Sequence, residues 1–433
     1  MPIAAGPLRF LLAFLLCATF GLAVATPGHG LGGSLDKTFS GDGMVRVHTR
    51  YGDEAHDMAL DREGRIVLVG VTWIRGDALP TAEVMRLTPG GALDRSFSGD
   101  GRRTLRFGAG GNVAEAVAIQ RDGRIVIVGH RYAYASDGTA LMDIARLLPG
   151  GRLDRSFGNE GVKEINLRYS REDAAESVAI QDDGKIVVGG AADDRGLLVR
   201  LRPSGRFDRT FGSRGRVLTA PTGKHFKALA IQPDGRILGA NYPLVRYLSN
   251  GRLDPSFGDG GEAIDPAGPQ SWGCTDIALK RNGRIVCSSH FHNDDLSSQS
   301  RDAAVVQWLP DGHPDSTFGG DGVIVTGIEP SPGPQRGGSF DEAYSVAIQP
   351  DGKILTAGTT YAITGPYPGD SFLVIRYRAS GELDSSFGDG GIVRTQFTGW
   401  TDYADTVALQ RDGRIVVGGT ALGSDMAVAR YLP

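Results

Sequence analysis

Short runs of apolar residues recur along the chain, each bounded by polar or glycine-rich turns. Runs such as Ile125–Val128 are apolar at every position and rich in β-branched residues. Their length is typical of strands, and no segment sustains the 3.6-residue period of an amphipathic helix. Because strands that are apolar throughout must be covered on both faces, the pattern predicts sheets that stack on other sheets.

Three motifs, in consensus LDxSFGxxG, AIQxDGRIVVxG and VARLxPxG, occur seven times each from residue 32 onward. Together they supply four strand-like runs per unit of about 58 residues. The phenylalanines of the first motif are Phe39, Phe97, Phe157, Phe211, Phe257, Phe318 and Phe387. Seven such units predict an all-β fold, a seven-bladed β-propeller of four-stranded antiparallel blades.

The chain ends offer a test of ring closure. In complete units the third-strand arginine stands eight residues before the loop aspartate. Joining the end of the chain to residue 32 restores this offset between Arg430 and Asp36. Residues 43–48 are therefore predicted to be the outer strand of the blade whose other strands lie at about 404–431. This pairing closes the ring and removes exposed sheet edges.

The combined motifs resemble the delta-60 repeat family of exported bacterial proteins, and the resemblance covers essentially all of residues 32–433. It implies a propeller of unknown function, and the family supplies no catalytic residues to carry over. The fifth unit departs most, with Leu-Lys-Arg-Asn at 279–282. The sixth has Gln307 and Pro314 where other units have arginine and leucine.

The loop aspartate recurs in all seven units and the third-strand arginine in six of them, whereas one active site needs a single constellation. Repetition therefore indicates a structural role. Our hypothesis is a charge-assisted hydrogen bond that ties the third-strand arginine to the loop aspartate, as between Arg146 and Asp154.

Lysine and arginine number 46, and aspartate and glutamate number 50, which gives a formal net charge of −4. The two signs are interspersed, without the basic excess or basic stripe that nucleic-acid binders carry. We therefore expect no nucleic-acid partner.

The first 25 residues have the features of a secretory signal peptide. Arg9 precedes an uncharged run, residues 10–25, that ends in the cleavage pattern Ala-Val-Ala. A retained anchor is the alternative, but the run is short and rich in alanine and glycine for a membrane span. We expect residues 1–25 to be removed near Ala25 and residues 26–433 to form a single propeller domain without a membrane span. The mature protein is expected to be monomeric and secreted, periplasmic or at the cell surface.

Export bears on two cysteines that flank a predicted hairpin turn, Cys274 and Cys287. An oxidising compartment permits a disulfide. With either plausible turn register, however, Cys287 lies opposite residue 277 or 278 and Cys274 lies opposite 290 or 291. The sulfurs would then be several residues apart along the ladder, so we expect two buried thiols.

Alternate connections of an up-and-down blade fall on opposite faces of the disc. The Asp-Gly turns and the LDxSFG connections share one face, and the irregular loops share the other. If the AVAIQ strands are innermost, the irregular face surrounds the mouth of the central channel. Variable loops on a rigid scaffold are where binding residues concentrate, so the functional surface is expected there.

A ring of side chains is expected at this mouth, six residues before the second alanine of each inner strand. Its members are Asp53, Asn112, Asp173, Lys224, Trp272, Asp341 and Asp402. Four aspartates and an asparagine could hold calcium. Lys224 and Trp272 interrupt the ring, however, and capping of the strand entry is the favoured interpretation.

The segment from His290 to Asp295 is the best candidate for a transition-metal site. His290 and His292 lie at i and i+2 of an extended segment and would face the same way. With Asp294 they could bind zinc, although a solvated polar loop is the favoured interpretation. Calcium and zinc are therefore the candidate cofactors, and no cofactor is the favoured expectation.

Several aromatic residues are placed on the same irregular face. They include Trp73, Tyr132, Trp272 and Trp400. Exposed aromatic rings can stack on sugars or anchor a protein partner, and they can equally pack over the loops.

These features favour a binding or interaction module whose partner is a protein, a glycan or another component of the cell envelope. The alternatives are a propeller enzyme of the lyase, hydrolase or quinoprotein type, with its site at the channel mouth, and an envelope scaffold. No GxSxG, HExxH or P-loop motif occurs. An enzyme is expected to gather His, Arg and Glu around one pocket with shifted pKa values, whereas a binder is expected to show a broad aromatic and polar surface.

Overall fold

The computed structural model of the chain describes residues 32–48, 52–73, 79–132, 140–167, 173–220, 225–240, 243–264, 266, 268, 273–292, 301–328, 340–362, 369–397 and 401–433. The predicted signal peptide, residues 1–25, lies outside these ranges. Within them, no helix is long and apolar enough to cross a membrane.

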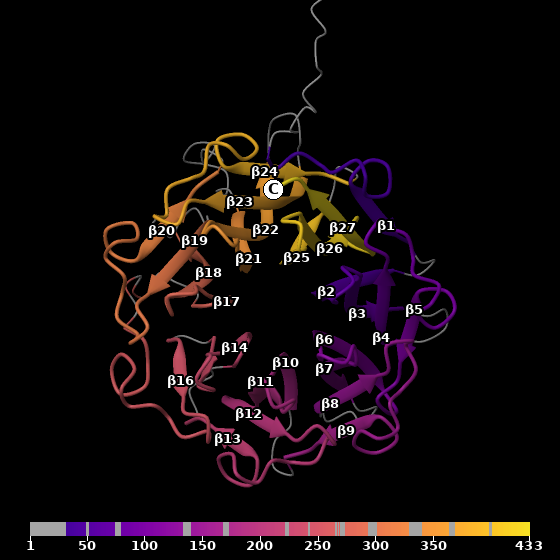
Figure 1. Cartoon of the computed structure of the whole chain (residues 1–433). Helices are drawn as coiled ribbons and strands as arrows, with labels where there is room; N and C mark the ends of the chain where they lie inside the picture. The colour runs from indigo at the N-terminus through magenta and orange to yellow at the C-terminus, as the bar shows by residue number, and fades with distance from the viewer. Residues whose placement is uncertain are drawn as a thin grey trace, which may run out of the picture. The chain divides into compact units, whose positions relative to one another are not determined.

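The described strands form seven antiparallel blades, which are numbered in chain order (Figure 1). Within each blade, the strands are given from the centre of the ring outward. Blade 1 contains β2 (Asp53–Leu60), β3 (Ile66–Thr72), β4 (Thr81–Leu87) and β5 (Arg102–Leu105). Blade 2 contains β6 (Gly111–Ile119), β7 (Ile125–Tyr132), β8 (Ala140–Leu147) and β9 (Val162–Ile165). Blade 3 contains β10 (Asp173–Ile180), β11 (Ile186–Ala192), β12 (Arg195–Leu201) and β13 (Arg216–Leu218).

Blade 4 contains β14 (Leu229–Ile231), β15 (Ile237–Gly239) and β16 (Val245–Tyr247). Blade 5 contains β17 (Asp276–Leu279), β18 (Ile285–His292), β19 (Arg301–Trp308) and β20 (Val323–Thr326). Blade 6 contains β21 (Phe340–Ile348), β22 (Ile354–Ala362), β23 (Gly369–Tyr377) and β24 (Ile392–Thr395). Blade 7 contains β25 (Tyr403–Leu409), β26 (Ile415–Ala421), β27 (Asp425–Tyr431) and β1 (Met44–Val47).

The second strand of each blade is buried along its length, as the apolar runs predict. In β7 the four residues Ile125–Val128 are at most 2% exposed. Residues from neighbouring blades pack on both of its faces: Val126 and Val128 belong to one core cluster, and Ile125 and Ile127 to the next. The core therefore lies between the blades, one cluster per gap.

Closure of the ring follows the prediction. Strand β1 pairs antiparallel with β27, from Met44 opposite Ala429 to Val47 opposite Met426. In Figure 1 the indigo β1 lies beside the yellow β27. The backbone of Asp36 continues the junction, since its N–H donates to the carbonyl of Arg430 at 2.8 Å.

Blade 4 is the least regular of the seven. Its described strands have three residues each, and in place of a fourth strand there is a single bridge between Val245 and Glu262. Gly239 stands in β15 where blade 2 has Ile127. A Cβ there would meet the buried ring of Phe226 at 2.5 Å, so the ring occupies the space that a second-strand side chain fills elsewhere.

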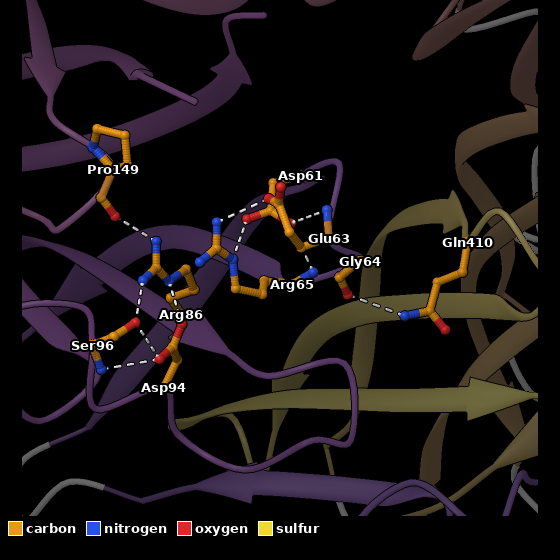
Figure 2. A network of polar contacts seen from close by, with 9 residues as sticks. All are labelled: Asp61, Glu63, Gly64, Arg65, Arg86, Asp94, Ser96, Pro149 and Gln410. Carbon is orange, nitrogen blue, oxygen red and sulfur yellow. Dashed lines mark hydrogen bonds and ion pairs between the residues drawn. The ribbon is translucent and has the colours of Figure 1, made fainter. Parts of the chain in front are cut away.

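The predicted arginine–aspartate bond is confirmed, and it belongs to a larger contact between blades. In blade 1, Arg86 Nε donates to Asp94 Oδ2 at 2.8 Å, and Arg86 Nη2 donates to Ser96 Oγ at 2.9 Å (Figure 2). The third donor, Nη1, reaches the carbonyl of Pro149 in blade 2 at 2.5 Å. The guanidinium also lies 4.8 Å from the ring centre of the buried Phe97. One side chain thus joins the loop, the core and the next blade.

The other blades repeat this contact. The pairs are Arg146–Asp154 at 2.9 Å, Arg200–Asp208 at 3.0 Å, Arg246–Asp254 at 2.8 Å, Arg376–Asp384 at 2.9 Å and Arg430–Asp36 at 2.8 Å. Gln307, expected in the sixth unit, lies in β19 of blade 5, and its amide donates to Asp315 Oδ2 at 2.7 Å.

The expectation of two free thiols is wrong. Cys274 and Cys287 form a disulfide, with their Cα atoms 5.6 Å apart. Cys287 lies opposite Ile277, as one of the two registers predicted. Thr275, however, donates its backbone N–H to the carbonyl of Ser288, which already pairs with Asp276. Two residues of the inner strand therefore share one partner, and Cys274 comes one step closer to Cys287 than a regular ladder allows.

Candidate functional site in the central channel

A β-bulge interrupts the inner strand of five blades. In blade 2, for example, Ala114 pairs with Gly129 and Ala116 pairs with Val128, so Glu115 is the extra residue. The extra residues of the five bulges are His56, Glu115, Glu176, Tyr344 and Asp405.

The glycine that ends the AIQxDGRIVVxG motif permits the bulge. A Cβ on Gly129 would stand 2.0 Å from the carbonyl oxygen of Val113, which no side chain tolerates. The equivalent glycines Gly70, Gly190, Gly358 and Gly419 have the same contact at 1.8–2.0 Å. Blades 4 and 5 have Asn241 and Ser289 at this position.

The bulge positions of all seven inner strands line one cavity in the central channel, with a volume of about 290 Å³. Lys227 of blade 4 and Thr275 of blade 5 complete the set. The residues that follow the bulges also line it, among them Asp57, Ser177, Asp276, Ser345 and Thr406. The cavity wall is therefore dense in ionisable groups and hydroxyls.

His56 and Glu115 form an ion pair across the junction of blades 1 and 2. His56 Nδ1 lies 3.1 Å from Glu115 Oε2 and 3.1 Å from the carbonyl oxygen of Ala114. Burial by itself lowers the pKa of His56, but the bond and charge of Glu115 outweigh it and the net pKa is raised. Burial by itself raises the pKa of Glu115, but the bond and charge of His56 and the charge of His130 together outweigh it, and the net pKa is lowered. Both groups are therefore held in their charged forms.

Three aspartates of the cavity behave in the opposite way. Burial raises the pKa of Asp57 to about 7 and that of Asp405 to about 8. The charge of Asp57 adds to the rise for Asp405, and the charge of Asp276 adds to the rise for Asp57. Burial likewise raises the pKa of Asp276. The channel thus holds carboxyl groups that keep their protons near neutral pH beside Glu115, which does not.

A second polar cluster extends from the cavity into blades 5 and 6. The hydroxyl of Tyr344 donates to Glu342, which also accepts a bond from Arg301. His290 Nε2 lies 4.0 Å from Glu342 Oε1. Burial raises the pKa of Glu342, but the bonds from Tyr344 and Arg301 outweigh it and the net pKa is lowered. The carboxylate at this position is therefore ionised and anchored.

The predicted ring of aspartates lies at the strand entries, three residues before the bulges. Asp173 Oδ2 accepts the N–H of Leu167 at 2.8 Å, Asp341 Oδ2 that of Ile328 at 2.9 Å, and Asp402 Oδ2 that of Phe397 at 2.8 Å. Asn112 Oδ1 accepts the N–H of Phe107 at 2.8 Å, and Asp53 Oδ2 lies 3.3 Å from Arg102 Nη2. Each of these side chains therefore connects the start of an inner strand to an outer strand or to the loop that follows an outer strand. Lys224 and Trp272 lie outside the described residues.

The predicted metal segment is described only in part. His290 and His292 are on β18, the side chain of His290 is buried, and Asp294 lies outside the described residues. Among the residues that are described, no three His, Cys, Asp or Glu side chains are grouped so as to hold a metal ion. The zinc and calcium sites stay predictions.

Two of the four predicted aromatic residues are described. Tyr132 is 45% exposed at the end of β7, with its ring edge-on to His130 at 4.9 Å between centres. Trp73 follows β3, and its backbone N–H donates to the carbonyl of Gly52 at 3.1 Å. Trp272 and Trp400 lie outside the described residues.

The sequence reasoning missed the residues that line the cavity. They occupy the position before the AVAIQ run, where the side chain differs from blade to blade, so no motif marks them. A signal was nevertheless present. A glycine inside an otherwise apolar strand indicates a bulge, and Gly129 and its equivalents point to the residues opposite them.

Comparison with known proteins supports this architecture. Residues 64–97, 120–157, 181–211, 349–387 and 410–433 match the domain of unknown function DUF5122, a β-propeller family. No curated protein matches the sequence. Virginiamycin B lyase from Staphylococcus aureus, as an inactive variant with quinupristin, superposes with a TM-score of 0.50 at 10% identity over 90% of this chain and 99% of the lyase.

The selenomethionine form of that lyase gives a TM-score of 0.51 at 9% identity, over 90% of this chain and 98% of the other. An ulvan lyase of polysaccharide lyase family PL25 gives 0.45 at 12% identity, over 90% and 96% of the two chains. At such identities the likeness concerns the fold alone. The chain is a β-propeller, and five of its segments match the DUF5122 family.

Proposed function

We propose that the chain is a binding protein that acts outside the cytoplasm and takes a small polar ligand in its central channel. One observation carries the proposal: seven inner strands deliver their bulge positions into one cavity of about 290 Å³. Ligand pockets typically measure about 300–1,000 Å³, so this volume suits a ligand the size of a monosaccharide or an amino acid. The loops of the irregular face would admit that ligand, free or as the end of an envelope glycan.

The charges of the cavity suggest which ligand it takes. Its wall contains five carboxyl groups against two cationic side chains, His56 and Lys227. The raised pKa of Asp405 and of Asp57 reflects how strongly the site resists further negative charge. An ammonium group entering the channel would favour their ionised forms and gain attraction to both. The proposed ligand is therefore a small hydroxylated molecule with a positively charged group, such as an amino sugar.

The location is supported by two independent features. The first 25 residues have the composition of a signal peptide. The Cys274–Cys287 disulfide is a type of bond that persists in oxidising compartments and is rare in the cytosol. Export to the periplasm, the cell surface or the medium accounts for both.

Calorimetric titration with glucosamine, N-acetylglucosamine and glucose at pH 7 tests the proposal. Glucosamine is expected to bind more tightly than the two neutral sugars, and Asp405→Asn is expected to remove that preference. Asp182→Asn is the matched control, because this carboxylate is 90% exposed in the turn between β10 and β11. Equal binding of the three sugars, or a preference that survives Asp405→Asn, would contradict the ligand class.

A second candidate, acid–base catalysis, is favoured by one specific feature. Asp405 and Glu115 both interact electrostatically with His56, and their pKa values are displaced in opposite directions. Such a pair can supply a proton donor and a proton acceptor in one pocket. This convergence is what an enzyme of the lyase or hydrolase type is expected to show.

The enzymatic alternative is tested by incubating the protein with acidic and amino-sugar polysaccharides. A lyase is expected to create a new double bond, seen by ultraviolet absorbance, and a hydrolase new reducing ends. Either activity should be lost in Asp405→Asn and kept in Asp182→Asn. If glucosamine binds and no polysaccharide is cleaved, binding is the function and catalysis is excluded for those substrates.

A further inference from the structure

The connection from β12 to β13 in blade 3 has an unusual local charge. Between residues 202 and 216 the chain contains five arginines, Arg202, Arg206, Arg209, Arg214 and Arg216. The short loop after the motif phenylalanine carries an acidic residue in each of the other six copies, Asp42, Asp100, Glu160, Asp259, Asp321 and Asp389. In blade 3 this loop reads Gly-Ser-Arg-Gly, with Arg214. The even mixture of charges along the whole chain therefore conceals a basic cluster.

Two grooves lie at this cluster, and both are lined by Phe207 and Arg209. The larger, of about 860 Å³, also includes Lys163, Arg202 and Arg206, and it reaches the outer strand β9 of blade 2. The smaller, of about 700 Å³, reaches the outer strand β13 of blade 3 and contains Arg214 and Arg216. We call the two together the arginine groove. It begins at the connection from β12 to β13 and extends along the outer strands β9 and β13.

Phe207 orders two of the cations. It stands where five other copies have leucine. Lys163 Nζ lies 4.8 Å from the ring centre of Phe207, and the guanidinium of Arg216 lies 4.5 Å from it. Burial lowers the pKa of Lys163, and the charge of Arg216 lowers it further. Two like charges are thus held against one ring, and an anion bound beside either of them would offset their repulsion.

The remaining arginines have no acidic partner in the part of the chain that the structure describes. Arg202, Arg206, Arg209 and Arg214 are all exposed. Two carboxylates of the groove and its connection are engaged elsewhere: Glu164 pairs with Arg131, and the buried Asp208 pairs with Arg200 at 3.0 Å. Four guanidinium groups are consequently free to bind carboxylate or sulfate groups with two parallel hydrogen bonds each.

We propose that the arginine groove binds an acidic polysaccharide, a glycan chain that carries carboxylate or sulfate groups. The concave shape suits a single strand lying along it, whereas a membrane presents a broad, nearly flat surface. Single-stranded nucleic acid is typically held by exposed aromatic rings on which the bases stack. Phe207 offers no such platform, because Lys163 and Arg216 lie against its ring. This site is separate from the channel cavity and does not depend on the ligand proposed there.

The replacement residues used in the test are those found at equivalent positions in other repeats. In the triple variant Arg202→Leu, Arg209→Ser, Arg214→Gly, each new residue is the one that an equivalent position carries, namely Leu148, Ser385 and Gly390. Arg214 has a positive φ of 56°, so glycine there also relieves strain and the variant should fold. The matched control changes Arg62, Arg281 and Arg411 to proline, the residue found at Pro233 and Pro350. Both variants remove three positive charges.

Binding of heparin and polygalacturonate is measured by titration, with neutral dextran, poly(dT) and phosphatidylglycerol vesicles as comparators. The unchanged chain is expected to bind both acidic glycans and not dextran, with affinity that falls as salt rises. The triple variant should bind them at least about tenfold more weakly, and the control within about twofold of the unchanged chain. An equal loss in both variants would reduce the effect to overall charge and overturn the site. Binding to poly(dT) or to vesicles that is tighter than to either glycan, and equally dependent on these arginines, would overturn the ligand class.

Discussion

Asp57 of blade 1 accepts the backbone N–H of Val117 in blade 2, with 2.9 Å between N and Oδ2. Val117 lies two residues after a bulge. At the equivalent place in blade 6, Asp276 of blade 5 accepts the N–H of Val346 at 3.0 Å. In both places, the carboxyl group that follows the bulge position of one blade accepts a hydrogen bond from the backbone near the bulge of the next blade. The groups that line the channel also hold neighbouring blades together, so changes in the cavity are expected to affect stability as well as binding.

The glycine opposite each bulge should tolerate no side chain. Gly129→Ala would place a Cβ 2.0 Å from the carbonyl oxygen of Val113, so we expect a loss of about 1–3 kcal/mol in the free energy of unfolding, typical of overpacking. Gly150→Ala is the control, because its nearest atom outside its chain neighbours is 4.0 Å away. Urea unfolding measures both. Equal stability of the two variants would show that the bulge can relax.

The arginine–aspartate contact should be strongly coupled. In a double-mutant cycle of Arg146→Ala and Asp154→Ala, we expect a coupling energy of about 1–3 kcal/mol, because both side chains are only 6% exposed. The exposed pair Arg121–Asp182 should give less than about 1 kcal/mol. Denaturant unfolding of the unchanged chain and the six variants provides the two values. If Arg146 and Asp154 prove additive, the contact is incidental to the fold.

Stability should fall as the pH rises through neutrality. Burial raises the pKa of Asp405 to about 8 and that of Asp57 to about 7, well above the value of about 3.9 in an unfolded chain. The folded state therefore binds more protons than the unfolded state between about pH 4 and pH 8, and it loses this advantage as the groups ionise. Thermal melts from pH 5 to pH 9 should show a declining midpoint. Asp405→Asn should flatten the decline, whereas Asp182→Asn should leave it as it is.

The disulfide should form when the chain is produced in an oxidising compartment, and it should matter for stability. It closes a loop with a sequence separation of 13 residues, for which chain entropy predicts a stabilisation of about 3 kcal/mol. The double variant Cys274→Ser, Cys287→Ser should lose about that amount, and it should be insensitive to reductant. Intact-mass measurement supplies an independent check, because the oxidised chain is lighter by two hydrogen atoms. A chain purified from the oxidising compartment with two free thiols would contradict the structure.

Repetition explains which features could be predicted from the sequence. The number of blades, the pairing of β1 with β27 and the bond between Arg146 and Asp154 each depend on signals that recur in most units. The Cys274–Cys287 disulfide occurs once and depends on a local shift of register at Thr275, which a regular ladder does not anticipate.

The cavity was hidden for a related reason. A binding site on a repeat scaffold is made by the positions at which the copies differ, and those positions form no pattern. His56, Glu115 and Asp405 are alike only in lying opposite a glycine, and what they form together depends on the closed ring.

Because β1 pairs with β27, the last blade can form only after the C-terminal strands have been synthesised. During synthesis β1 emerges early and finds no partner until β27, encoded almost the whole repeat array later, is available. Six blades can assemble from consecutive strands, but the seventh has to wait for both ends. A chain that is cut short before β27 leaves β1 and the facing edge of the array unpaired, and such edges are templates for aggregation. The final blade thus forms only when the repeat array is complete. Truncated chains are expected to be insoluble or degraded.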